Sequence, residues 1–232
     1  MQMTVRNVSE MLQVSETTVV RLVKYRGLPA QRIAGHLRFS RVDVLDWAIA
    51  NRFKVKSQPF DQRAASRSDS FAGALTAGGV HYQVPGDDAA SALQAVVERL
   101  PLPAEFDRES LLRLFVAREA RGSTAIGDGI AIPHVRRPIV LRVHDTLATL
   151  CFLNRPISYQ APDGKPVRIL FSIVSSTVAA HVQILARLSR ALHDPGFRKS
   201  VMATEAREVI LQHARRVEEA AWNSDGSDPR AA

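Results

Sequence analysis

His134 is the residue of this chain whose surroundings most clearly indicate chemistry. It follows Ile132-Pro133, and proline fixes its own φ and favours extended geometry in the residue before it, so the histidine is presented from a stiff segment. The turn Gly127-Asp128-Gly129 lies just upstream. A neutral imidazole held in this way can attack an electrophile and carry the transferred group covalently. The alternative is a histidine with only a surface or hydrogen-bonding role.

The run from Arg118 to His134, REARGSTAIGDGIAIPH, closely resembles the active-site segment of a known family. The family is the IIA components of the phosphoenolpyruvate:sugar phosphotransferase system, fructose/mannitol class, and the resemblance is nearest to its nitrogen-regulatory branch. It implies that His134 accepts a phosphoryl group from an HPr-type phosphocarrier protein. It also implies that Arg118 and His181, which opens the sequence HVQILARL, belong to the same site.

Phosphoryl transfer requires an in-line nucleophile and positive or hydrogen-bonding groups around the phosphoryl oxygens. In this interpretation His134 is the nucleophile and carrier, Arg118 is a cationic clamp, and His181 is a donor that orients the group. The simpler alternatives are a surface ion pair for Arg118 and an ordinary residue of a helix start for His181. No further cofactor is expected.

The elements that position these residues are predicted from hydrophobic periodicity. A helix capped by Asp107 ends near Arg118, and strands are expected over 146–153 and 167–174. A helix capped within 175–177 follows, with His181 in its first turn, where unpaired backbone N–H groups favour an anion. The predicted fold class is therefore α/β, with a IIA-type mixed sheet flanked by helices.

The first fifty residues have a different pattern. Helices are predicted over 5–12, 16–25 and 41–51, with a β-hairpin around Ala34-Gly35-His36. This pattern resembles the winged helix-turn-helix of phage excisionases and MerR-like regulators. The resemblance implies that the second helix enters the major groove of double-stranded DNA and that the hairpin approaches the backbone. The residues that would contact DNA are Thr17, Thr18, Arg21, Lys24 and Arg38.

Charge is unevenly placed along the chain. The net charge is +8, and residues 1–56 hold ten Lys/Arg against four Asp/Glu. A basic segment attached to a near-neutral remainder indicates a polyanion partner, although a solvated basic face would look the same. A small winged module buries little surface, so tight DNA binding is expected to need a homodimer.

We expect four segments: a winged helix-turn-helix domain at 1–53, a flexible linker at 54–79, a IIA domain at 80–220, and a disordered tail at 221–232. The seven histidines are scattered and the chain has one cysteine, so the sequence predicts no metal site. It contains no apolar run of membrane-spanning length and no signal-peptide pattern, so we expect a cytoplasmic protein without membrane insertion.

Three functions remain open from the sequence. The favoured hypothesis is a regulator in which phosphorylation of the IIA domain is coupled to DNA binding. The others are a sugar-transport phosphocarrier, and a recombination or architectural DNA-binding factor whose IIA domain is inactive. For the first, the simplest expectation is that a phosphorylated IIA domain captures the basic domain and releases DNA, but the sequence leaves the sign of the coupling open.

Overall fold

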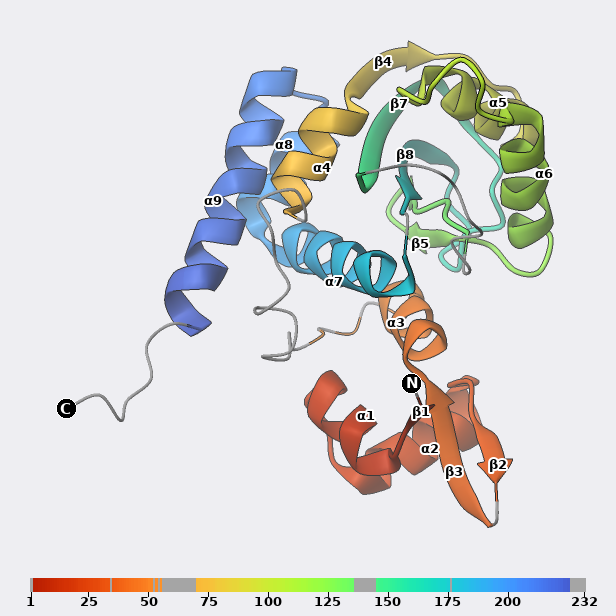
Figure 1. Ribbon diagram of the computed structural model, residues 1–232, viewed down its shortest axis with the longest axis vertical. Helices are drawn as coiled ribbons and strands as arrows, with labels where there is room; N and C mark the ends of the chain where they lie inside the picture. Colours follow the sequence, from red (N-terminus) through yellow and green to blue (C-terminus); the bar gives the residue numbers. More distant parts are fainter. Residues whose placement is uncertain are drawn as a thin grey trace.

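The computed structural model describes residues 2–33, 35–51, 53, 55, 70–135, 145–175 and 177–225. We call residues 2–51 the head and residues 70–225 the body. The two contact each other directly: the third helix of the head lies against the body (Figure 1).

The head consists of three helices and a small antiparallel sheet of order β1-β3-β2. Each helix begins after a hydroxyl residue whose side chain accepts a hydrogen bond from a backbone N–H of the first turn, as N-caps do. The predicted helices and hairpin are confirmed, and the short first strand was not predicted. The elements are α1 (Val5–Leu12), α2 (Glu16–Arg26), α3 (Arg41–Ala50), β1 (Gln2–Met3), β2 (Gln31–Ile33) and β3 (His36–Ser40).

The body is built on a five-stranded mixed sheet of order β4-β7-β8-β6-β5. The β4–β7 and β6–β8 pairs are parallel, whereas β7–β8 and β5–β6 are antiparallel. The strands are β4 (Val80–Val84), β5 (Ala125–Gly127), β6 (Ile130–Ala131), β7 (Leu147–Ile157) and β8 (Val167–Val174).

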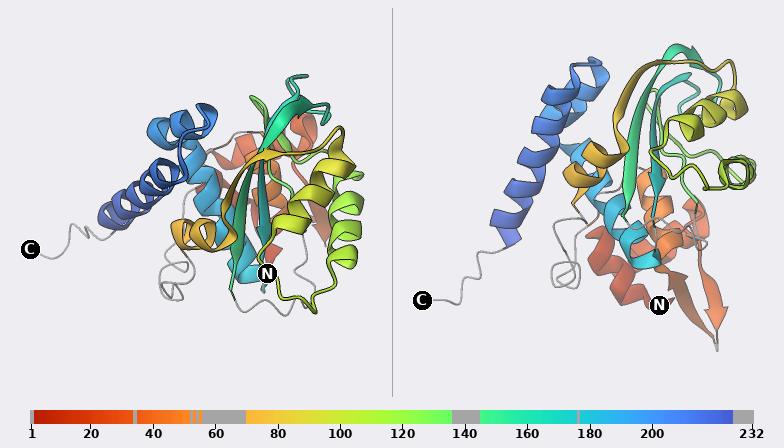
Figure 2. Two further views of the ribbon diagram at one scale, coloured as in Figure 1. Left: turned by 90° about the horizontal axis from the view of Figure 1, so that it is seen from above. Right: turned by 45° about the horizontal axis from the view of Figure 1, so that its top comes forward.

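Helices cover both faces of this sheet (Figure 2). Successive residues of β7 point to opposite faces, so Leu150 and Phe152 join the core shared with α4, α7, α8 and α9, while Cys151 and Leu153 pack on the α5 side. The predicted α/β class is therefore confirmed. The helices are α4 (Phe71–Gly78), α5 (Ala89–Arg99), α6 (Arg108–Glu119), α7 (Val178–His193), α8 (Pro195–Met202) and α9 (Arg207–Asp225). No helix in the described part of the chain is long and apolar enough to cross a bilayer.

Two predicted boundaries differ from the structure. The expected linker 54–79 contains α4, which buries Phe71 and Leu75 against the body, so residues 71–78 belong to the body. Sequence reasoning missed this helix because its small residues, AGALTAG, carry little periodic signal. The expected tail 221–232 begins inside α9, which continues to Asp225. Of the linker, 54 and 56–69 lie outside the described residues, as do 226–232 of the tail.

The packing of α4 on β7 generates a stability prediction. A methyl group added at Gly78 would lie 2.3 Å from the backbone oxygen of Ala148, and backbone cannot move aside cheaply. We expect Gly78→Ala to lower the free energy of unfolding by about 1–3 kcal/mol, measured by urea denaturation. Thr76→Ala, an exposed change on the same helix, should stay within about 0.5 kcal/mol of the parent. Equal stability of Gly78→Ala and the parent would contradict this packing.

Candidate functional site

His134 is held by backbone contacts on both sides, as the Ile-Pro segment predicted. The N–H of Ile132 donates to the oxygen of Thr124, and the oxygen of Pro133 accepts from the N–H of Ile173, so the segment continues the sheet beyond β6. His134 is 5% exposed, and its Nδ1 lies 2.7 Å from the oxygen of Ile132. The ring is therefore fixed in orientation, with Nε2 directed away from its own strand.

Arg118 lies in the last turn of α6, as expected. Its Nη1 donates to the oxygen of Gly122 at 2.8 Å, which ties the guanidinium to the loop leading to β5. The neighbouring Glu119 accepts hydrogen bonds from both the N–H and the hydroxyl of Thr124. These contacts tie the loop between α6 and β5 to the end of α6 at two points, Gly122 and Thr124. The position of Arg118 is therefore fixed by its hydrogen bond to this loop.

His181 lies in the first turn of α7, whose N-cap is Thr177. Its ring is 5.3 Å from that of His134, centroid to centroid, and the side chain is 1% exposed. Burial, together with a smaller contribution from the neighbouring His134, lowers the pKa of His181 to about 4, and Asp46 opposes the shift. His181 is therefore a neutral imidazole near neutral pH. The structure thus brings the two predicted histidines together.

Asp46 of the head completes the site, and sequence reasoning missed it. It lies in α3, which packs against α7 and β5 of the body. Its Oδ1 is 3.0 Å from Nε2 of His134, and its Oδ2 is 3.9 Å from Nη2 of Arg118. Asp46 is 7% exposed. The three predicted phosphoryl-site residues of the body therefore surround a carboxylate supplied by the head.

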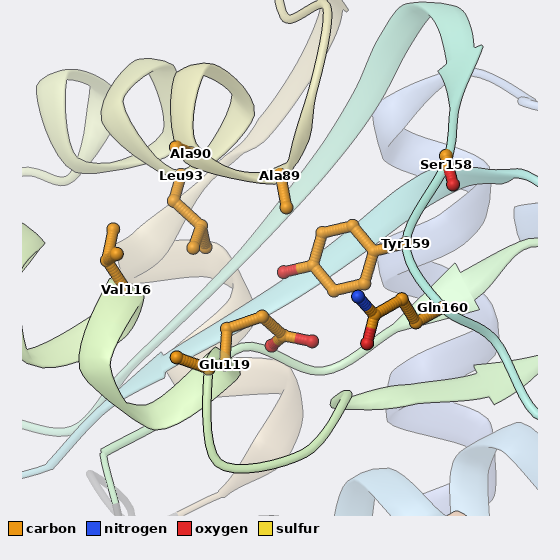
Figure 3. Close-up of a pocket in the computed structure, with 9 residues that line it drawn as sticks. Ala89, Ala90, Leu93, Val116, Glu119, Ser158, Tyr159 and Gln160 are labelled. Atoms are coloured by element: carbon orange, nitrogen blue, oxygen red, sulfur yellow. The ribbon is translucent and has the colours of Figure 1, made fainter.

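A separate pocket of about 300 Å³ lies between α5, α6 and the loop after β7. Figure 3 shows the hydroxyl of Tyr159 directed toward its interior, with Glu119 on one wall. Burial raises the pKa of Tyr159, and Glu119 adds to the shift, so the phenol stays protonated. The pocket includes Glu119 at the end of α6, next to Arg118, but neither His134 nor His181 lines it.

The residues expected to contact DNA lie on α2 and β3 of the head, whereas α3 is the helix of the head that packs against α7 and β5 of the body. Thr17, Arg21 and Lys24 are exposed on α2. Thr18 is half-buried, and its hydroxyl hydrogen-bonds that of Ser15 at 2.9 Å. Arg38 is half-buried on β3. Docking on the body consequently leaves the predicted groove-facing surface of α2 open.

Comparison with known proteins identifies the body. Residues 75–215 match the family described as phosphoenolpyruvate-dependent sugar phosphotransferase system, EIIA 2. The chain belongs to this family. Residues 3–52 of this EIIA-family chain match a helix-turn-helix domain, so both resemblances noted in the sequence are confirmed.

The relatives of this EIIA-family chain include regulatory proteins. It is 30% identical over 142 residues to the nitrogen regulatory protein of Pseudomonas aeruginosa, covering 60% of this chain and 90% of that one. The corresponding protein of Bradyrhizobium diazoefficiens is 31% identical over 122 residues, 50% and 78% of the two chains. Among solved structures, the nitrogen regulatory IIA protein of Neisseria meningitidis superposes with a TM-score of 0.54 at 22% identity, covering 62% of this chain and 97% of that one, which supports the fold.

The Asp46 contact predicts what holds the head in place. Removing one partner of a buried ionic contact typically costs about 3–5 kcal/mol, because the other partner stays desolvated. We expect Asp46→Ala to release the head in a large fraction of molecules and to raise the radius of gyration in small-angle X-ray scattering. Glu10→Ala removes an exposed acid of α1 whose ion-pair partner Arg6 lies on the same helix; it is the control and should scatter like the parent. Unchanged scattering of Asp46→Ala would mean that apolar packing alone docks α3.

Proposed function

We propose that this protein accepts a phosphoryl group on His134 from an HPr-type phosphocarrier protein and that this modification controls how the DNA-binding head docks. The observation that carries the proposal is the Asp46 carboxylate of the head seated 3.0 Å from Nε2 of His134. Membership in the EIIA family supports the first half of the proposal, and the helix-turn-helix match supports the second.

His134 is suited to the chemical step by its tautomer. A backbone carbonyl can only accept a hydrogen bond, so the Nδ1 atom beside the oxygen of Ile132 carries the ring proton. Nε2 then supplies the lone pair that attacks phosphorus. A new N–P bond forms at Nε2 as the N–P bond to the carrier's imidazole breaks, and the electron pair of that bond stays with the carrier.

Arg118 and His181 are suited to hold the transferred group. Arg118 already faces an anion, the Asp46 carboxylate, at 3.9 Å. Nε2 of His181 is buried without a hydrogen-bond partner among the described residues, so it is available to a phosphoryl oxygen. A cation and a hydrogen-bond donor beside the nucleophile stabilise charge on the transferred oxygens.

The docked head and the phosphoryl group cannot share this site. The side chains of His134 and His181 are almost fully covered, so a carrier protein reaches them only after α3 has moved away. After transfer, the dianionic phosphoryl group occupies the place of the Asp46 carboxylate and repels it. Phosphorylation therefore favours an undocked head.

The open face of α2 supports one sign of the coupling. The unmodified, docked protein can present Arg21 and Lys24 to DNA from a fixed orientation. Phosphorylation removes that fixed orientation and adds negative charge to the tethered body, and both changes disfavour a polyanion. We propose that the unmodified form is the stronger DNA binder, because the unmodified body, rather than the phosphorylated one, holds the head.

Labelling by a phosphorylated histidine carrier tests the chemical half. His134→Ala should abolish labelling, and His181→Ala should slow it by roughly 10–1000-fold, since an orienting donor stabilises charge without carrying the group. Asp46→Ala should accelerate labelling, because the carrier then reaches an open site. We expect at least about a fivefold increase, the lower end of the usual range of coupling between two sites. Rates come from quenched time courses, with mapping of the modified residue by mass spectrometry.

Glu10→Ala should be labelled at the parent rate and serves as the control for Asp46→Ala. Label on another residue in His134→Ala would remove the assignment of the acceptor. A slower reaction in Asp46→Ala would instead give Asp46 a supporting role in transfer and would contradict docking as a barrier.

Duplex affinity of the two phosphorylation states tests the regulatory half. A duplex selected from a random pool by the unmodified full-length protein should bind with an affinity that falls steeply with salt. At one salt concentration, phosphorylation should weaken binding by at least about fivefold. Arg21→Ala should weaken it in both states, and Arg113→Ala, on the exposed face of α6, should not. Fluorescence anisotropy gives the affinities, and values equal within about twofold would leave the head and body uncoupled.

A further inference from the structure

We propose that Asp46, His134 and His181 form a site for one divalent transition-metal ion of the Zn²⁺ type, bound at the contact between head and body. The carboxylate comes from α3 of the head, and the two imidazoles come from the β6 extension and α7 of the body. This inference goes beyond the proposed phosphoryl transfer and does not depend on it.

The three side chains offer a suitable set of ligand atoms. One atom from each lies within 4.8 Å of the others, and all three residues are buried. Zinc bonds of about 2.0–2.1 Å in a tetrahedron place ligand atoms about 3.3 Å apart. The 3.0 Å separation of Asp46 Oδ1 and His134 Nε2 is near that value, so binding requires mainly an approach of His181. Two nitrogens and one carboxylate oxygen, with an open fourth position, are a known zinc arrangement.

The short contact between Nε2 of His134 and Oδ1 of Asp46 requires a proton or a metal ion between the two atoms. Because Nδ1 of His134 faces the oxygen of Ile132, the neutral ring presents a lone pair at Nε2. A carboxylate oxygen 3.0 Å away presents another lone pair. Two acceptors at this separation are stable only with a proton or a metal ion between them, and the proton turns His134 into an imidazolium.

His181 provides the observation that favours a metal over the proton alone. Its side chain is 1% exposed, and its Nε2 has no hydrogen-bond partner within the described residues. A proton shared by His134 and Asp46 leaves this buried polar atom unsatisfied, which is costly. A metal ion bound at this nitrogen, with the ring proton on Nδ1, would satisfy it.

The surroundings resemble those of a built metal site in one respect and differ in another. A metal-binding histidine usually donates its second ring N–H to a backbone carbonyl or a carboxylate, and the oxygen of Ile132 supplies that acceptor for His134. The opposing feature is the guanidinium of Arg118, a second positive charge. It lies nearest Oδ2 of Asp46, at 3.9 Å, which leaves Oδ1 to face the metal.

The ligand types select the class of ion. Two imidazoles favour Zn²⁺, Co²⁺, Ni²⁺ or Cu²⁺, whereas Mg²⁺ and Ca²⁺ prefer sites made entirely of oxygen. Because the ligands come from both head and body, the ion would strengthen docking. It would also exclude a phosphoryl group, since both need Nε2 of His134.

The test uses the full-length, unphosphorylated protein after treatment with a chelator. Isothermal titration with Zn²⁺ should show one ion per chain, and Co²⁺ should develop the visible absorption of a four-coordinate site. Asp46→Ala, His134→Ala and His181→Ala should each weaken Zn²⁺ binding by at least about tenfold. Mg²⁺ and Ca²⁺ should give no saturable heat. The only cysteine, Cys151, is fully buried in β7, where burial raises the pKa of its thiol to about 12, so it offers no competing thiolate.

His36→Ala, an exposed histidine on the wing, is the control and should bind Zn²⁺ like the parent. Circular dichroism of each variant, with Asp46→Asn as a second variant of nearly the same size, separates lost ligation from lost folding. If the parent does not bind Zn²⁺, a proton between His134 and Asp46, and not a metal ion, stabilises their contact. Zn²⁺ binding unchanged in Asp46→Ala and His181→Ala would place the ion elsewhere; either result overturns the proposal and leaves phosphoryl acceptance to be judged by labelling.

Discussion

The buried contact between the Asp46 carboxylate and the His134 imidazole joins the two parts of the molecule. A carboxylate transferred from water into a protein interior loses several kcal/mol of hydration, and it stays charged only where donors or cations replace that water. His134 lies 3.0 Å from one of its oxygens, and Arg118 lies 3.9 Å from the other. The body therefore contains an anion site before any phosphoryl group reaches it, and the head supplies the anion.

This contact depends on a body whose site residues have little freedom to move. Ile132 and Pro133 hydrogen-bond to flanking backbone, and Asp128 adopts a φ of 53° between two glycines that are also in the left-handed region. Glu119 anchors Thr124 through two hydrogen bonds at the start of the same segment. In the proposed switch, a site fixed by backbone in this way cannot adjust to a phosphoryl group on His134, so the head moves instead.

The sequence was informative wherever the signal is local. Caps, hydrophobic periodicity and the Ile-Pro-His order predicted the helices of the head, the strands β7 and β8 of the sheet, and the location of His134. The family resemblance added Arg118 and His181. Asp46 could not be found this way, because its role depends on residues 88 and 135 positions further along the chain. One local signal existed: Asp46 lies between Leu45 and Trp47 in a helix segment that is buried throughout, where a lone acid needs a partner. The sequence predicted no metal site from spacing along the chain, and spacing carries no information about Asp46, His134 and His181, which only the fold brings together.

The tether between head and body is what would allow the proposed switch to depend on one contact. A linked domain faces its partner at an effective concentration in the millimolar range, so docking needs only a modest interface rather than a stable intermolecular one. A weak docking equilibrium is also one that a single change of charge can reverse: a shift from 99% docked to 99% undocked requires about 5.5 kcal/mol of differential interaction.

A phosphoryl group on His134 would change the electrostatic energy of docking twice. It removes the attraction between Asp46 and a proton or metal ion at His134, and it adds repulsion between Asp46 and a dianion. Burial keeps both terms large, because water does not screen a pair whose members are each less than one-tenth exposed. The same pair placed at the protein surface would change docking by roughly 1 kcal/mol and would not act as a switch.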